Sequence, residues 1–474
     1  MSGVVAALFA CAVLGLAIDR GLLGDPGRGT IERTGRALML GLGAAGCLSL
    51  LVDAICLGVT RSSVGGAAVL LLLALARPAL RVSARCVREQ PLPAESDDRG
   101  ILAARVGLLL LAAVGLGLAV HAGWSRPTFQ FDALARWMFK AKALYVDGTL
   151  LGPVSTDEAF GFTHQRYPPL VSHIANLPQL IAGGPFDDRI GSAIFPWFAV
   201  AMVGVAYGAL RRRCGALCAA LGAAWIANLP LLSYVFAPPP GAGASSAMAD
   251  IPLGLFILGA LLAAADGVEQ RRVRGHLEAG LLLAFAMLTK NEGTPFAAAL
   301  CLGVLVAAPR ARGRRALGIL AVGLGVFFLL WGWIALGLPA TDEHYAGRIH
   351  TGALQEGIGR LGIILPRMGR ELINFRAWSL TWPAVLALLC LGWRSLRGPV
   401  PRLVLMALAV QLASYVMAYV VTVWSSPAAE FLYPGGDPLP FLMDLTLGRL
   451  IMQVAPAAIV LALIVSPLEA RRSG

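Results

Sequence analysis

Charged residues are scarce in this sequence. Only 14% of the 474 residues are Asp, Glu, Lys or Arg, whereas 57% are hydrophobic, and the mean hydropathy is +0.73. A water-soluble fold of this length cannot bury so many apolar side chains, which excludes a soluble protein. The net charge of +12 does not indicate a nucleic-acid partner, because the arginines lie in short linkers between apolar runs. The sequence therefore predicts an all-α polytopic membrane protein.

Several motifs of soluble enzymes are also missing. The chain contains no Gly-rich phosphate loop, no nucleotide fingerprint, no Ser-His-Asp order and no H-E-x-x-H spacing. The eight cysteines are scattered, and Cys214 and Cys218 have no nearby His or Cys, so we interpret the cysteines as small core residues. A cytosolic nucleotide substrate is unsupported, and the sequence assigns no cofactor with certainty. A site for a divalent metal ion remains an alternative, with candidate ligands at His164, His173, His344 and His350.

Apolar runs of membrane-spanning length recur along the chain and predict about thirteen transmembrane helices. Two of these runs, 190–210 and 216–236, flank the arginines of positions 211–213. Most of the 39 lysines and arginines fall in alternate short linkers, which the positive-inside rule assigns to the cytoplasm. We therefore expect a bacterial inner-membrane protein with its N-terminus outside, its C-terminus in the cytoplasm and its active face outward.

The domain organisation follows from the same spans. Residues 1–100 are expected to form N-terminal transmembrane helices, the first of which lacks the basic flank of a cleaved signal peptide. Residues 101–474 are expected to form a second unit. Its polar segments, predicted to face outward, are residues 122–189, 237–250, 339–376 and 425–446.

The segment from Phe129 to His173 is too polar to cross a bilayer and is rich in aromatic residues. Steps of four from Asp132 reach Arg136 and Lys140, which would share one face of an α-helix. The apolar residues between them would occupy the other face, so the pattern predicts an amphipathic helix lying on the membrane surface. This places Asp132 at the boundary between lipid and water, although the Asp132–Arg136 pair could also serve only to solvate the outer face.

Polar groups from distant parts of the chain fall on the same predicted side as Asp132. Asp250 begins a span, Lys290 and Glu292 interrupt two short apolar runs, and Arg449 lies near the start of the last span. Charges at membrane depth are costly unless they face a cavity or a partner, which favours a site. Structural alternatives remain for each group: Asp250 as a helix cap, the Lys290–Glu292 stretch as a surface hairpin, and Arg449 as a snorkelling anchor.

The order of these motifs resembles the GT-C superfamily of membrane glycosyltransferases. The first-loop acid Asp132 is followed by Y-P-P-L from Tyr167, A-D-I-P-L around Asp250, T-K-N-E-G around Lys290 and L-T-x-G-R ending at Arg449. The set is most similar to glycosyltransferase family 39, the protein mannosyltransferase and aminoarabinose transferase group. The resemblance runs from about residue 101 to the end of the chain.

The resemblance implies transfer of a sugar from a polyprenyl-phosphate donor to a glycan, lipid or protein acceptor on the outer face. By position, Asp132 and Asp250 correspond to the family's two acids and are the catalytic candidates. Tyr167 stands where the family usually has a lysine, which leaves the donor phosphate contact open. Cations suited to a departing phosphate are Lys140, Arg166, Lys290 and Arg449. Candidates for binding the substrate are His164, Tyr167 and Glu292.

Inverting transfer needs one base for the acceptor proton, and Asp132 can supply it. The phosphate leaves as an anion and needs no acid. A different class of protein, a transporter or flippase of a lipid-linked or amphipathic substrate, would also use interrupted helices. The absence of an inverted repeat, and polar segments outside the membrane, favour the enzyme over the transporter. A noncatalytic scaffold would leave Asp132 replaceable.

Overall fold

The computed structural model describes residues 2–23, 29–55, 57–84, 99–128, 130–233, 245–270, 273–308, 310–339, 351–422 and 438–467. Every regular element within these residues is a helix, which confirms the predicted all-α class. Parts of the predicted outward segments lie outside the described residues, namely 237–244, 340–350 and 425–437. The candidate metal ligands His344 and His350 belong to these parts.

The first half of the described chain holds the following helices: α1 (Ser2–Ile18), η1 (Asp19–Leu23), α2 (Thr30–Ala54), α3 (Arg61–Ala84), α4 (Arg99–Ser125), η2 (Ala133–Met138), α5 (Phe139–Asp147), α6 (Pro153–Thr156), η3 (Glu158–Thr163), α7 (Leu170–Ala182), α8 (Asp188–Ser192), α9 (Pro196–Ala227) and α10 (Pro230–Ser233). The second half holds α11 (Asp250–Gln270), α12 (Val273–Thr289), α13 (Gly293–Ala307), α14 (Arg310–Phe327), η4 (Phe328–Gly332), α15 (Trp333–Gly337), α17 (Thr351–Ile358), α18 (Leu361–Leu372), α19 (Phe375–Trp378), α20 (Thr381–Leu391), η5 (Ser395–Arg397), α21 (Pro399–Val421) and α23 (Leu439–Val465).

Eight helical stretches of the described residues are long and apolar enough to cross a membrane, and four shorter apolar helices accompany them. The stretch that contains α9 is not one straight rod. Gly215 has a φ of 84° and interrupts the helical backbone, and a Cβ on Gly222 would collide with the side chain of Leu210. Residues twelve apart in a straight helix are about 18 Å apart, so α9 doubles back at Gly215. This reversal agrees with the two predicted runs, 190–210 and 216–236.

The sequence prediction missed α7. This helix lies within residues 122–189, which were predicted to be a polar outward segment, yet ten consecutive residues from Leu170 to Gln179 are buried. The helix packs against α1, α2 and α5. It was missed because its apolar run is short and interrupted by His173, Asn176 and Pro178, so no window of span length is apolar throughout.

The N-terminal helices pack tightly on the rest of the bundle. The helices α1 and α2 cross where Gly15 faces the backbone of Ala37 and Gly41 faces the backbone of Cys11, and neither position has space for a side chain. Small residues at such crossings let helix backbones approach closely in a membrane. Gly35 of α2 contacts the α9 backbone in the same way. The helices α1 and α2 therefore form part of the same packed body as the later helices.

A group of charged side chains, most of them buried, lies at one end of the bundle, and we name it the basal cluster. Its members are Asp19, Glu32, Arg36, Arg212, Arg213, Asp266, Glu269 and Glu278. Arg36 Nη2 lies 2.9 Å from Asp19 Oδ1 and 2.8 Å from Glu278 Oε2. Arg212 forms ion pairs with Glu32 and Asp266. The cluster joins η1, α2, α9, α11 and α12 through charge pairs.

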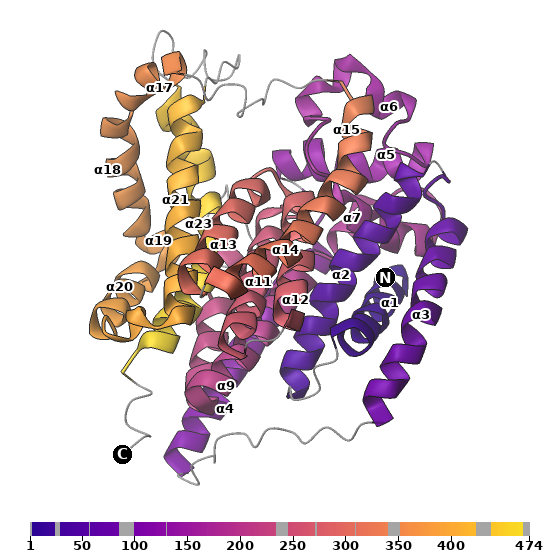
Figure 1. Cartoon of the computed structure of the whole chain (residues 1–474). Helices are drawn as coiled ribbons and strands as arrows, with labels where there is room; N and C mark the ends of the chain where they lie inside the picture. Colours follow the sequence, from indigo (N-terminus) through magenta and orange to yellow (C-terminus); the bar gives the residue numbers. More distant parts are fainter. Residues whose placement is uncertain are drawn as a thin grey trace.

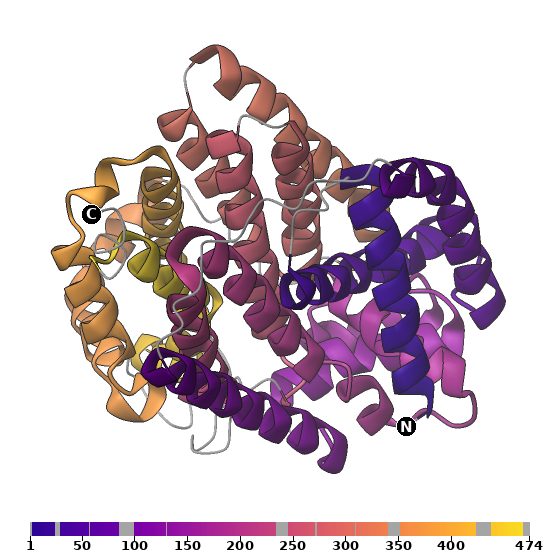
Figure 2. The same cartoon turned by 90° about the horizontal axis from the view of Figure 1, so that it is seen from below.

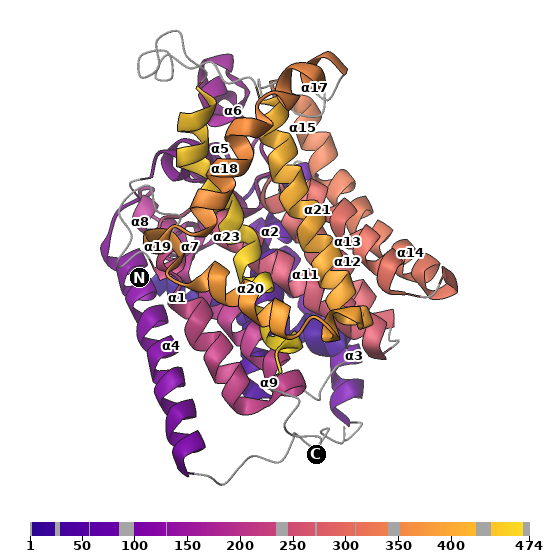
Figure 3. The same ribbon diagram turned by 90° about the vertical axis from the view of Figure 1, so that its left-hand side faces the viewer.

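The basal cluster and the polar residues at the other end are separated along α12. Glu278 belongs to the basal cluster, and Lys290 follows the end of the same helix, so about 18 Å of helix lies between them. The helices α5, α6 and α17 gather at one end of the bundle, whereas α3 and α4 extend toward the opposite end (Figures 1 and 3). Seen from below, α1–α3 lie on one side of the central helices, and α18–α21 lie on the other (Figure 2).

Candidate active site

Asp132 immediately precedes the π-helical turn η2, which continues into α5. The α-helical pattern predicted an outer polar face containing Asp132, Arg136 and Lys140. The structure corrects this, because Lys140 is buried and Phe131 is exposed. The three charges still share one side of the segment, as their spacing predicts, because Arg136 and Lys140 both bond to His164 and Arg136 pairs with Asp132. This side faces the protein, and not the water as predicted.

Lys140 supports the loop that follows η3. Its Nζ donates hydrogen bonds to the carbonyl oxygens of His164 (2.8 Å) and Tyr167 (2.9 Å). A buried ammonium group is stable only with such acceptors. Lys140 was predicted to contact the donor phosphate. This geometry instead favours a structural role, in which Lys140 holds the loop in place.

Asp250 and Lys290 meet where three helix ends come together. Asp250 is the first residue of α11, and Lys290 lies in the turn between α12 and α13. Lys290 Nζ is 2.9 Å from Asp250 Oδ1 and 2.7 Å from Glu292 Oε1. Both Asp250 and Lys290 are buried. The turn is therefore not a surface hairpin, and its lysine faces an acid inside the protein.

Arg449 connects Asp250 with Asp132. Its Nε donates to Asp250 Oδ2 at 3.1 Å, and its Nη1 donates to Asp132 Oδ2 at 2.6 Å. The arginine extends from α23, more than 300 residues after Asp132 in the sequence. With both acids bonded to its guanidinium group, Arg449 is not a snorkelling anchor.

We name the connected group Asp132, Arg136, Asp250, Lys290, Glu292 and Arg449 the site cluster. It brings together the two predicted acids and two of the four predicted phosphate ligands. The side chains of Asp132 and Glu292 keep 21% and 20% of their surface exposed. A substrate can therefore reach two carboxylates of this cluster, while Asp250 and Lys290 lie beneath them.

The charges around Asp132 control its protonation. Burial raises the pKa of the Asp132 carboxyl group, but the positive charges of Arg136, Arg449 and Lys290 outweigh burial and hold the pKa below its ordinary value. Asp132 is therefore ionised at neutral pH. Its Oδ2 is bonded to Arg449, whereas Oδ1 is 3.8 Å from Arg136 Nε.

The predicted substrate-binding residues lie beside the site cluster. The Tyr167 hydroxyl is 3.4 Å from Glu292 Oε2, and the guanidinium group of Arg136 lies 5.5 Å from the centre of the Tyr167 ring. Arg136 Nη2 also donates to His164 Nε2 at 2.8 Å. Burial, together with the charges of Arg136 and Lys140, lowers the pKa of His164 to about 3, so its imidazole is neutral.

Arg166 does not bond to any member of the site cluster through its Nε atom. Its Nε donates to the carbonyl oxygen of Leu338, just after α15, at 2.9 Å. Arg166 is half-buried and exposes part of its side chain. It can therefore reach a phosphate only at the edge of the site, whereas Lys290 and Arg449 lie at its centre.

The sequence analysis missed three residues of this network. Gln453 Nε2 donates to Asp250 Oδ1 at 2.7 Å, and the Tyr415 hydroxyl donates to Gln453 Oε1 at 2.8 Å. Gln411 Nε2 donates to the carbonyl oxygen of Glu292 at 3.1 Å. A signal was available, because glutamines in the interior of two apolar spans are costly without such partners.

The C-terminal end of helix α2 is hydrogen-bonded to the loop that follows α5. Asp53 accepts hydrogen bonds from the Thr149 hydroxyl group (2.6 Å) and from the Leu150 amide (3.1 Å). His173, a candidate metal ligand, shares a hydrogen bond of 2.9 Å with Ser49 Oγ. No group of three His, Cys, Asp or Glu side chains suited to a metal occurs among the described residues. The N-terminal helices thus contact the loop that carries Asp132.

Comparison with protein families gives one match. Residues 166–333 match the family described as dolichyl-phosphate-mannose-protein mannosyltransferase. Comparison with curated proteins and with solved structures gives no match. The matched segment contains Asp250, Lys290 and Glu292, whereas Asp132 and Arg449 lie on either side of it. The match agrees with the resemblance seen in the motifs: residues 166–333 are similar to a family of membrane glycosyltransferases of the GT-C type.

Proposed function

We propose that this protein transfers a sugar, with inversion, from a polyprenyl-phosphate donor to an acceptor on the extracytoplasmic face of the membrane. The observation that carries the proposal is the site cluster, in which Arg449 joins a partly exposed acid, Asp132, to a buried pair, Asp250 and Lys290. The cluster lies at the end of the bundle away from Arg212 and Arg213, which the positive-inside rule assigns to the cytoplasm.

The departing group in this reaction is a lipid phosphate. Breaking the bond between the anomeric carbon and the phosphate oxygen leaves the bonding electrons on that oxygen, so the phosphate needs cations rather than a proton. Lys290 and Arg449 supply two cations, and Arg166 can add a third at the edge. Cations held in place before the reaction stabilise developing negative charge without reorganising.

Asp250 acts on the reaction through these cations. Its carboxylate is buried, and its two oxygens are bonded to Lys290, Arg449 and Gln453. An acid enclosed in this way has no route to a sugar hydroxyl. We therefore assign Asp250 as a positioning residue that orients Lys290 and Arg449, which modifies the catalytic role expected from its sequence position.

Asp132 is the base for the acceptor. Its ionised carboxylate would take the proton of the attacking hydroxyl group as the new bond to the anomeric carbon forms. The more weakly bonded oxygen, Oδ1, is the one available to the acceptor. A lowered pKa makes Asp132 a modest base, which suffices where the leaving phosphate develops charge early in the transition state. His164, Tyr167 and Glu292 would line the sugar pocket beside it.

The test is Asp132→Asn, assayed as release of polyprenyl phosphate by purified protein across a panel of polyprenyl-phosphate sugars. Asn keeps the shape of the side chain but cannot accept the proton, so turnover should fall by roughly 10²- to 10⁴-fold. Asp187→Asn is the matched control, because Asp187 is an acid of the same outward segment that pairs only with its neighbour Arg189. Turnover of Asp132→Asn at the wild-type rate, with the protein folded, would exclude Asp132 as the base.

A further inference from the structure

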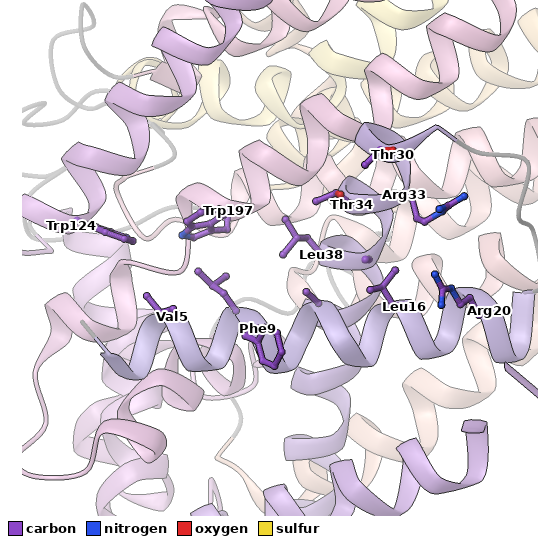
Figure 4. Close-up of a pocket in the computed structure, with 13 residues that line it drawn as sticks. Val5, Phe9, Leu16, Arg20, Thr30, Arg33, Thr34, Leu38, Trp124 and Trp197 are labelled. Atoms are coloured by element: carbon purple, nitrogen blue, oxygen red, sulfur yellow. The ribbon is translucent and has the colours of Figure 1, made fainter. Parts of the chain in front are cut away.

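A groove of about 580 Å³ runs between α1 and α2 (Figure 4), and its lining includes no member of the site cluster. Its walls are apolar for most of its length, formed by Leu8, Phe9 and Leu16 of α1 and by Leu38 of α2. Phe9 keeps 71% of its surface exposed, so the groove opens sideways. In a membrane-spanning bundle, that opening faces lipid. The shape suits a single extended hydrocarbon chain better than a compact solute.

The two ends of the groove differ in chemistry. Arg20 and Arg33 line one end together with Thr30 and Thr34, and Figure 4 draws both arginines at that end of the groove. Two cations and two hydroxyl groups are the ligands that a phosphodiester prefers. The neighbouring acid, Asp19, is already bonded to Arg36 in the basal cluster. This end of the groove is lined by two cations and is suited to an anionic headgroup.

Two tryptophans, Trp124 and Trp197, lie at the opposite end of the groove (Figure 4). Tryptophan is favoured at the boundary between lipid and water, which places this end near the other membrane surface. From Val5 to Arg20, α1 rises about 22 Å, most of the thickness of the hydrocarbon core. An acyl chain attached to a headgroup at Arg20 can thus extend along the groove toward the tryptophans.

We propose that α1 and α2 bind one anionic phospholipid, with its phosphate between Arg20 and Arg33 and one acyl chain in the groove. The charge at the end of the groove selects an anionic lipid over a zwitterionic one, because the amine of a zwitterionic headgroup cancels much of the attraction. The arginine end lies beside the basal cluster, at the far end of the bundle from Lys290 and Arg449. The bound lipid is therefore distinct from the sugar donor, and its binding does not depend on the proposed reaction.

Native mass spectrometry of the delipidated full-length protein tests this inference. The protein would be titrated with phosphatidylglycerol, with phosphatidylethanolamine of the same acyl chains, and with a polyprenyl phosphate. We expect one phosphatidylglycerol to bind preferentially. The double variant Arg20→Gln/Arg33→Gln should weaken its binding by roughly 10- to 30-fold and remove the preference for the anionic lipid. A thermal unfolding curve checks that the variant remains folded.

The matched control is Arg314→Gln/Arg315→Gln, which removes the same charge from two exposed arginines of α14 and should leave lipid binding unchanged. Ala12→Phe fills the groove without changing charge and should weaken binding of both phospholipids. Three results would overturn the proposal: equal binding of the two phospholipids, unchanged binding in both groove variants, or tighter binding of polyprenyl phosphate than of phosphatidylglycerol. Because the readout is bound lipid, failure of the proposed glycosyl transfer would leave it unaffected.

Discussion

The basal cluster and the site cluster contain the same kinds of side chain but differ in access to solvent and ligands. In the basal cluster, Arg36 and Glu278 keep only 4% and 3% of their side-chain surface exposed. In the site cluster, Asp132 and Glu292 keep 21% and 20%. Buried and fully paired charges can only hold helices together, whereas partly exposed ones can also meet a substrate. Exposure, more than composition, separates the enclosed Arg36–Glu278 pair from the carboxylates of Asp132 and Glu292.

Arg36 and Glu278 also sit at different places on their helices from Asp132, Asp250 and Lys290. Arg36 and Glu278 lie within α2 and α12, where neighbouring helices pack against them on several sides. Asp132 lies before η2, Asp250 begins α11, and Lys290 follows α12. Helix ends leave space that no further turn of helix fills, and their unpaired backbone groups remain available to ligands. A reaction site is therefore expected at such ends.

The largest effect should come from breaking the basal cluster with Arg36→Met. Removing the arginine leaves Asp19 and Glu278 buried without this partner, which should destabilise the protein by about 3–5 kcal/mol. Thermal unfolding in detergent would measure the loss, with exposed Arg314→Gln as the control. Transfer per folded molecule should stay close to wild type. Wild-type stability of Arg36→Met would contradict a structural role for the cluster.

A smaller effect should follow in the site cluster from Arg449→Lys. Lysine keeps the charge but cannot bond Asp132 and Asp250 at once through a planar guanidinium group. Losing one charged hydrogen bond should slow release of lipid phosphate by roughly 10- to 100-fold. Stability should change less than in Arg36→Met, because a cation remains between the acids. If stability fell as far as in Arg36→Met while turnover held, the two clusters would have the same role.

The smallest effect should come from pH, through His164. Its pKa is lowered from 6.5 to about 3 in the folded protein, so between these values the unfolded chain binds a proton that the folded chain does not. The free energy of unfolding is therefore not reduced by His164 above about pH 6.5. Below that value it declines as the pH falls toward 3. Asp132 has a lowered pKa and adds stability that is lost only below its ordinary value of 3.8.

The replacement His164→Gln isolates this contribution. Its melting temperature should fall less than that of wild type between about pH 7.5 and pH 5, because Gln does not titrate. An equal pH response in wild type and His164→Gln would show that His164 is not held neutral by Arg136 and Lys140.

Much of the site could be predicted from the order of polar residues in an apolar sequence. Asp132, Asp250, Lys290 and Arg449 were singled out because charge near a membrane is costly, and the structure brings the four together. Lys140 was expected at the same site but supports a loop instead. Its burial follows from which side of the segment faces the protein, and the spacing of Asp132, Arg136 and Lys140 does not encode that side.

The sequence by itself determined that the chain is a bundle of membrane-spanning helices with a few costly charges, because hydropathy and charge are local properties of the residues. Only the tertiary structure decided which charges meet, which are enclosed and which stay open to a ligand. Pairing between Asp132 and Arg449 spans 317 positions of sequence, and the groove between α1 and α2 requires two helices to cross at their glycines. Both follow from packing in three dimensions, which no local pattern encodes.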